Sequence, residues 1–208
     1  MRRIPENAVT ETAVLHQVLD AGLVAHLAVV DGGQPFVIPV AYARRGDTVV
    51  FHGSTGSRLF RALDAGAPTC LTVTLLDGLV LAHSAFESSM NYRSAVVIGT
   101  ARRLSGDDEL DALRTITEHL LPGRWSQCRP PNAKERAATM TLELPLDECS
   151  VKVRTGGPTD DPDDLADPLL SRVWAGTVPL VESFGEPIRS HEGPADAAVP
   201  SYLSLIHI

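Results

Sequence analysis

Short β-rich runs, closely spaced and separated by turn-forming residues, constrain the fold of this chain more than any other feature. Six such runs occupy residues 23–30, 35–43, 48–53, 69–76, 79–86 and 94–104. Strands joined by so few residues pair antiparallel, because a parallel pair needs a crossover of a dozen residues or more. The pattern predicts a mainly β fold, a six-stranded antiparallel barrel, with a tight turn at Asp77-Gly78 joining two of its strands.

Apolar residues at helical spacing predict peripheral helices at 10–21, 56–65 and 107–121, and further strands are expected at 138–146 and 150–153. We assign residues 1–155 to one barrel domain. Residues 156–202 are rich in Pro, Gly and Asp and are expected to form a partly docked C-terminal extension, with Trp174 as its anchor. The last six residues, LSLIHI (203–208), look like translated sequencing-library DNA and are excluded from fold reasoning.

Charge and composition exclude several classes of partner. A net charge of -8 gives no general attraction to nucleic acid or to an anionic membrane surface. No run approaches the roughly 18 apolar residues of a membrane-spanning helix, and no apolar segment follows Met1, so a cytoplasmic protein is expected. The cysteines are far apart, without a CxxC pair, and we expect no metal site.

The segment FHGSTGSRLFRAL (51–63) is predicted to run from a strand through a small-residue loop into a helix. Such a loop can offer backbone N–H groups and hydroxyls to an anion, and the guanidinium of Arg58 can bind two phosphate oxygens. His52 is the histidine best placed to face a ligand there. The pattern therefore indicates a phosphate cradle, although it also fits an ordinary capped helix.

Together with YRSAVVIGTARRL (92–104), the segment VIPVAYARRGDTVVFHGSTGSR (37–58) resembles the flavin-binding core of the pyridoxamine 5′-phosphate oxidase-like family. The likeness is greatest to its flavin-nucleotide-binding branch, which includes nitroimidazole-resistance-like proteins. It implies an FMN-binding split barrel and a homodimer with one flavin in each of two inter-subunit clefts. The residues that it assigns to the cofactor are Val37, Ile38, Pro39, Val40, Ala41 and Tyr42 along the isoalloxazine edge, His52, Gly53, Ser54, Ser57 and Arg58 around the phosphate, and Tyr92, Arg93 and Ser94, often from the other subunit.

The resemblance further implies an oxidoreductase that moves electrons from a reduced nicotinamide, NAD(P)H, to an unidentified small acceptor. The flavin itself carries the hydride chemistry, so no side chain is assigned a catalytic role. The arginine and histidine motif with which the oxidase binds its substrate has no equivalent here, and oxidation of vitamin B6 is not expected. Two alternatives stay open: a flavin- or small-ligand-binding protein without turnover, and a split barrel that holds haem or a deazaflavin.

Overall fold

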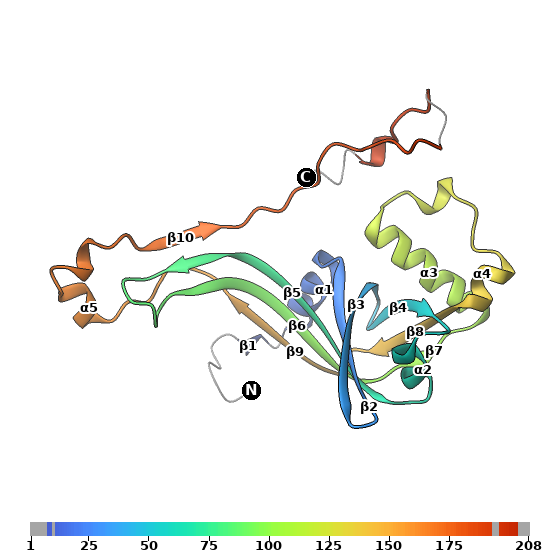
Figure 1. Ribbon diagram of the computed structural model, residues 1–208, viewed down its shortest axis with the longest axis horizontal. Coiled ribbons are helices and arrows are strands. Elements are labelled where there is room, and N and C mark those ends of the chain that lie inside the picture. Colours follow the sequence, from blue (N-terminus) through green and yellow to red (C-terminus); the bar gives the residue numbers. More distant parts are fainter. Residues whose placement is uncertain (1–7, 10, 193–195, 204–208) are drawn as a thin grey trace.

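The computed structural model describes residues 8–9, 11–192 and 196–203 (Figure 1). The strands are β1 (Ala8–Val9), β2 (Val24–Asp31), β3 (Gln34–Arg45), β4 (Thr48–Ser54), β5 (Pro68–Leu81), β6 (Ser89–Thr100), β7 (Arg102–Arg103), β8 (Thr139–Pro145), β9 (Glu148–Arg154) and β10 (Gly176–Pro179). The helices are α1 (Thr12–Ala21), α2 (Arg58–Asp64), α3 (Gly106–Leu120), α4 (Ala133–Ala138) and α5 (Pro162–Ala166), with 3₁₀ turns η2 (Trp125–Gln127) and η3 (Leu170–Arg172). None of the helices in these ranges has the length and hydropathy required of a membrane span.

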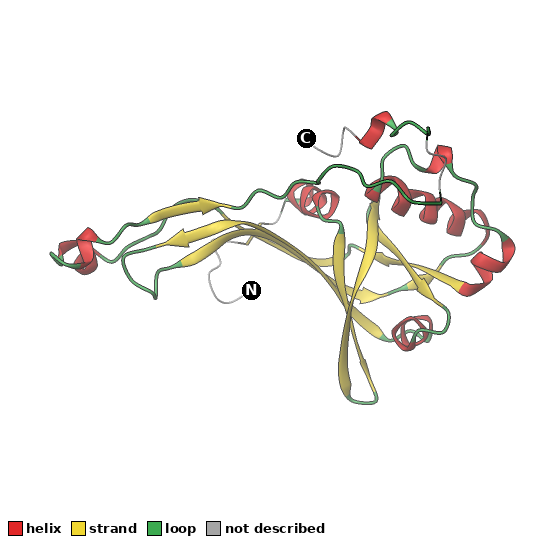
Figure 2. Ribbon diagram, turned by 45° about the horizontal axis from the view of Figure 1, so that its top comes forward, coloured by secondary structure: helices red, strands yellow, loops and turns green. Residues whose placement is uncertain are grey.

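The strands form one strongly curled antiparallel sheet, which confirms the predicted mainly β split barrel (Figure 2). The described residues form ten strands in this sheet, so the expected number of six is wrong. Its order is β1-β9-β6-β5-β2-β3-β4-β8-β7, and β10 adds to β5. Alternate side chains of these strands fill the interior, where the largest buried ones include Tyr42, Phe51 and Phe60. The hydroxyl of Tyr42 donates a hydrogen bond of 2.6 Å to the carbonyl of Leu19, which ties α1 to the sheet.

The predicted tight turn at Asp77-Gly78 is wrong, because β5 runs through these residues as one strand of 14 residues. The register against β6 shifts between Leu76 and Gly78, so the pair forms a β-bulge instead of a reversal. A β-carbon on Gly78 would lie 2.7 Å from the carbonyl oxygen of Val178 in β10. The glycine is therefore needed for close approach of another strand, and the hairpin turns at residues 82–88.

Strands β3 and β4 separate soon after the turn that joins them. Their pairing extends from Arg45–Thr48 to Tyr42–Phe51 and then ends. Beyond that point β3 pairs with β2, from Gln34 to Ala41, and β4 pairs with β8. Among the described residues, no strand therefore covers the second edge of β3 over residues 34–41, and we name this divergence of β3 from β4 the wedge.

A network of charged side chains lies beneath α3. Glu143 of β8 is nearly buried, and its Oε2 accepts a hydrogen bond of 2.6 Å from Arg45. Its other oxygen, Oε1, accepts from Nε of Arg102 over 3.0 Å and from Nη2 of the same guanidinium. Arg45 also binds Asp108 of α3 over 2.7 Å. The network joins β3, β7 and β8 to the helix.

The C-terminal extension runs past the tip of the β5–β6 hairpin, turns at α5 and returns along β5 as β10 (Figure 1). Within one chain it docks through strand pairing, and Trp174 is 62% exposed. An anchoring role for Trp174 against a partner subunit, which the expectation also allowed, stays a prediction. Further along, Tyr202 contacts the loop after α3 at Arg124 and Gln127. Of the excluded segment 203–208, residues 204–208 lie outside the described residues.

Candidate functional site

The wedge between β3 and β4 brings the phosphate-cradle loop next to the free edge of β3. The guanidinium of Arg58, the first residue of α2, lies 5.7 Å from the centre of the Phe36 ring of β3. Within the part of the chain that the structure describes, the backbone groups of residues 34–41 on this edge have no strand partner and can bind a ligand. The structure thus brings Arg58 of the predicted phosphate group beside β3, the strand that carries the predicted isoalloxazine group.

Arg58 is held by its neighbours but remains accessible. Its Nε donates to the carboxylate of Asp31, and its Nη2 donates over 3.3 Å to the backbone carbonyl of the same residue. The side chain is 54% exposed. These contacts leave Nη1 free to donate, so the guanidinium can bind an anion while Asp31 fixes its plane. Sequence reasoning missed both Asp31 and Phe36, because neither residue belongs to a recognisable motif.

More backbone N–H groups of the loop before α2 are hydrogen-bonded within the protein than the sequence suggested. The N–H of Thr55 donates to the carbonyl of Ala138, that of Gly56 to the hydroxyl oxygen of Ser54, and that of Ser57 to the carbonyl of Ser54. Three of the expected backbone donors are therefore bonded within the protein. The positive charge of the site comes from Arg58, and the loop shapes the approach to it.

Gly53 has a packing role in this loop. A β-carbon at this position would lie 2.2 Å from a ring carbon of Phe60. The missing side chain lets the buried Phe60 ring lie directly against β4, which fixes the first turn of α2 and hence Arg58. The glycine serves the site by positioning the helix.

His52 lies on β4 at the entrance to the loop, paired in the sheet with Thr141. The residue is exposed, and desolvation by its surroundings lowers the pKa of its imidazole below the usual value, which favours the neutral form. It can therefore exchange hydrogen bonds with a ligand, but it adds no charge to that of Arg58.

The six residues assigned to the isoalloxazine edge alternate between the two faces of β3. Val37 and Pro39 face outward, whereas Val40 and Tyr42 are buried in the core. Burial raises the pKa of the Tyr42 hydroxyl, which is already bonded to Leu19. Tyr42 can thus contribute only backbone groups to a bound ring, and the exposed surface there is supplied by the outward-facing residues.

Tyr92, Arg93 and Ser94 do not join this group within one chain. They lie on β6, which is separated from β3 by β5 and β2 in the sheet. Tyr92 and Ser94 share the outer face of the sheet, because they pair with Leu76 and Thr74. Arg93 faces the other way, and its Nη2 binds the bulge residue Asp77 over 2.7 Å.

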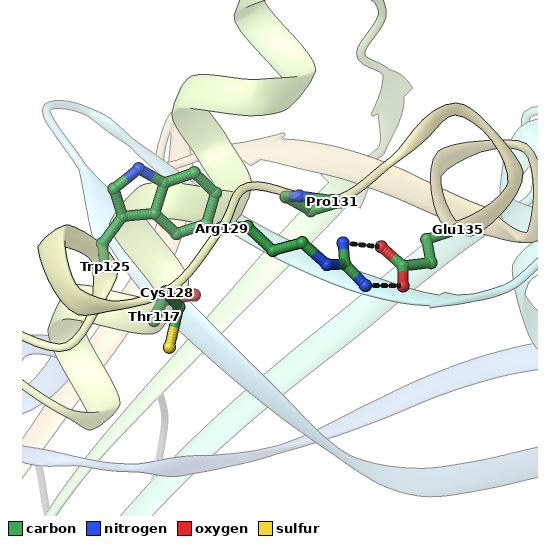
Figure 3. Close-up of a pocket in the computed structure, with 6 residues that line it drawn as sticks. All are labelled: Thr117, Trp125, Cys128, Arg129, Pro131 and Glu135. Carbon is green, nitrogen blue, oxygen red and sulfur yellow. Dashed lines mark hydrogen bonds and ion pairs between the residues drawn. The ribbon is translucent and has the colours of Figure 1, made fainter.

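A separate hollow lies between α3, η2 and α4 (Figure 3). Its volume is about 440 Å³, and its walls are Thr117, Trp125, Cys128, Arg129, Pro131 and Glu135. Arg129 there is paired with Glu135 through two hydrogen bonds of 2.6 and 2.8 Å. None of the predicted site residues lines it, and its cation is already neutralised.

Comparison with known proteins identifies the family of this split barrel and similar solved structures. The sequence profile of the family described as pyridoxamine 5′-phosphate oxidase matches residues 11–153. The solved FAD and haem binding protein from Mycobacterium smegmatis is 37% identical over 97% of this chain and 97% of its own, with a TM-score of 0.91. A flavocytochrome from Azotobacter vinelandii is 37% identical over 100% of this chain and 95% of its own, with a TM-score of 0.92.

A 5-nitroimidazole antibiotic resistance protein from Bacteroides thetaiotaomicron shares the fold at 18% identity, covering 70% of this chain and 86% of its own with a TM-score of 0.58. A search of curated protein sequences finds no match. The class defined by the fold is an antiparallel split barrel with an open wedge beside Arg58. The chain belongs to the pyridoxamine 5′-phosphate oxidase-like family, as the sequence resemblance implied.

Proposed function

We propose that this protein is a homodimeric flavoprotein that also binds haem and moves electrons from a reduced nicotinamide to a small acceptor. The observation that carries the proposal is the wedge itself: an accessible, oriented guanidinium beside an unpaired strand edge. A flavin fits these groups, because its phosphate is an anion for Arg58 and its ring edge presents hydrogen-bonding groups to a backbone. The two whole-length relatives support it through their names, FAD and haem binding protein and flavocytochrome.

The predicted FMN and the FAD of the mycobacterial relative share the ring, the ribityl chain and the first phosphate. The Arg58 cradle suits that shared part. Haem, which the sequence left as an alternative to flavin, enters here as a second group beside it. Analysis of the cofactor released by denaturation identifies which flavin this chain selects.

Dimerisation is supported by the outer face of the sheet. Exposed apolar side chains gather there on neighbouring strands, and by the strand register they share this face with Tyr92 and Ser94: Val24, Val30, Val37, Leu76 and Ile98. Exposed apolar side chains gathered on one face of a sheet favour an interface there. A second copy packed on this face would bring Tyr92 and Ser94 to the wedge of its partner, which completes the set of predicted flavin contacts.

The first test is the absorption spectrum of the protein purified without added cofactor, with flavin titration of Arg58→Ala. Hydrogen bonds to a charged group contribute about 1.5–3 kcal/mol, so the variant should bind flavin roughly 10- to 150-fold more weakly. Arg61→Ala, one turn along the same helix, removes an exposed arginine and should bind normally. Unchanged affinity in Arg58→Ala, or a colourless parent that ignores added FMN and FAD, contradicts the proposal.

Two further measurements test dimerisation and turnover. Ile98→Lys places a charge on the outer face away from Arg58 and should yield a monomer with weakened flavin binding, whereas Val181→Lys on the exposed extension should not. Dimers of both variants by light scattering would argue against this interface. Oxidation of NADH or NADPH by the purified protein separates an oxidoreductase from a flavin-binding protein without turnover. The expected cytoplasmic location stays a prediction.

A further inference from the structure

The turn at the tip of the β5–β6 hairpin holds a histidine against a carboxylate from the C-terminal extension. The backbone N–H of His83 donates to Oδ1 of Asp160 over 2.7 Å, and the ring Nδ1 lies 3.0 Å from Oδ2. Both side chains are largely buried, with 13% and 9% of their surfaces exposed. The double contact turns Nδ1 toward the carboxylate, so Nε2 is the ring nitrogen left to bind another group.

This arrangement is the one that metal-binding histidines adopt. A ligating imidazole commonly directs its second nitrogen to a carboxylate, which fixes the ring and makes the ligating nitrogen more basic. Other histidines of the barrel are placed differently. Nε2 of His119 is already bonded to the carbonyl of Gly22 over 2.7 Å, and His16 lies 3.6 Å from the exposed Asp47. His83 therefore has the geometry of a poised ligand.

Large apolar side chains surround the same end of the molecule. We name as the tip cluster five exposed residues of the hairpin turn, α5 and the segments on either side of η3: Phe86, Leu165, Leu169, Val173 and Trp174. Phe86, Leu169 and Trp174 are 90%, 76% and 62% exposed. Figures 1 and 2 both show α5 beside the hairpin tip. So much apolar surface in water indicates a bound partner, and a flat, apolar porphyrin matches aromatic and leucine side chains next to an imidazole.

The carboxylate and most of the tip cluster lie outside the family core. The family profile ends at residue 153, whereas Asp160 and four of the five cluster residues come after it. The two relatives named for haem and for a flavocytochrome cover 97% and 100% of this chain, so they include the extension. The part of the chain that supplies the second half of this site is thus shared with these relatives and absent from the family core.

We propose that the hairpin tip is the haem site, where Nε2 of His83 would bind the iron. Asp160 acts as a positioning residue that orients the imidazole, and the tip cluster covers part of the porphyrin. This inference rests on the proposed function, since it names where the haem of that function binds. It assigns the haem to the opposite end of the hairpin from the barrel, away from the Arg58 wedge of the same chain.

The experiment uses full-length protein, as purified and after addition of haemin, in three variants. His83→Ala should lose the Soret band of the parent or shift it to that of a high-spin haem, and added imidazole should restore the parent spectrum. The flavin bands in the same spectrum report whether the variant has folded. Asp160→Asn should weaken haem binding about 10- to 100-fold and make the reduction potential more positive, because the imidazole becomes less basic. His191→Ala removes an exposed histidine of the extension and should change neither value.

The possible outcomes distinguish failure of this inference from failure of the proposed function on which it rests. A parent that binds no haem even when haemin is added overturns the haem part of the proposed function and the site with it. A parent Soret band that persists unchanged in His83→Ala overturns the ligand assignment alone. An unchanged reduction potential in Asp160→Asn, with haem still lost in His83→Ala, overturns the role of Asp160.

Discussion

Gly53 gives the sharpest test of how the phosphate-cradle loop is built. A β-carbon at this position would lie 2.2, 2.5 and 2.6 Å from three carbons of the Phe60 ring, whereas carbon atoms in contact lie about 3.5–4.0 Å apart. The ring would have to move by roughly 1 Å or more. Phe60 is buried and packs edge-on against Phe51, with ring centres 6.1 Å apart, so the space for that movement is small.

Overpacking in a core costs about 1–3 kcal/mol, and the short distances place Gly53→Ala near the upper end. For a chain of this length, about 3 kcal/mol corresponds to a fall in Tm of roughly 6–12 °C. Thermal unfolding of the flavin-free protein measures it, and Phe60→Leu in the same chain should recover part of the loss. Gly56→Ala is the matched control, because its β-carbon would meet only the Ser54 hydroxyl at 3.5 Å. Normal stability with lost flavin binding in Gly53→Ala would refute the packing argument.

Three further predictions follow from single contacts. Glu143→Gln should lower the free energy of unfolding, measured with urea, by about 2 kcal/mol, because two guanidinium groups lose a nearly buried carboxylate. An unchanged unfolding midpoint would mean that the network adds no stability. Tyr42→Phe should cost about 1–2 kcal/mol by removing the bond to Leu19, and hydrogen exchange at the end of α1 should quicken. The pKa of Glu135 is lowered to about 2 by Arg129, so this pair should persist as pH falls until that pKa is reached; a carboxyl titration by NMR near the ordinary value would contradict it.

The local sequence pattern was sufficient to predict most of the barrel. Turn residues and alternating apolar runs predicted the antiparallel sheet, and helical spacing predicted α1, α2 and α3 close to their observed bounds. Gly78 shows where local reading fails. A glycine after an aspartate is typical of a turn, but here its lack of a side chain admits Val178, which lies 100 residues further along the chain. Only the tertiary contact distinguishes the two roles.

In the candidate site, too, some residues could be predicted from the local sequence and others could not. Arg58 and its loop were found from the sequence because a strand, a small-residue loop and a helix follow one another there. Asp31, which orients Arg58, is 27 residues away and ends β2 beside a hairpin turn, where an aspartate is commonplace. The pairing of His83 with Asp160 spans 77 residues and joins a hairpin turn to an extension that the sequence predicted only as partly docked, without naming a partner for it. Neither pair leaves a signal in a single sequence.

The extension therefore has more than one physical role in this chain. Beyond the residues that pair with β2, β5 would present an open edge, and such edges invite non-specific strand pairing. β10 covers the end of that edge from Gly78 to Leu81, and the same excursion delivers Asp160 to the hairpin tip. Sealing an edge gives the extension a reason to dock that is independent of any cofactor. Once docked, it carries a carboxylate and apolar side chains to His83, so the proposed second binding site requires no change in the Arg58 wedge.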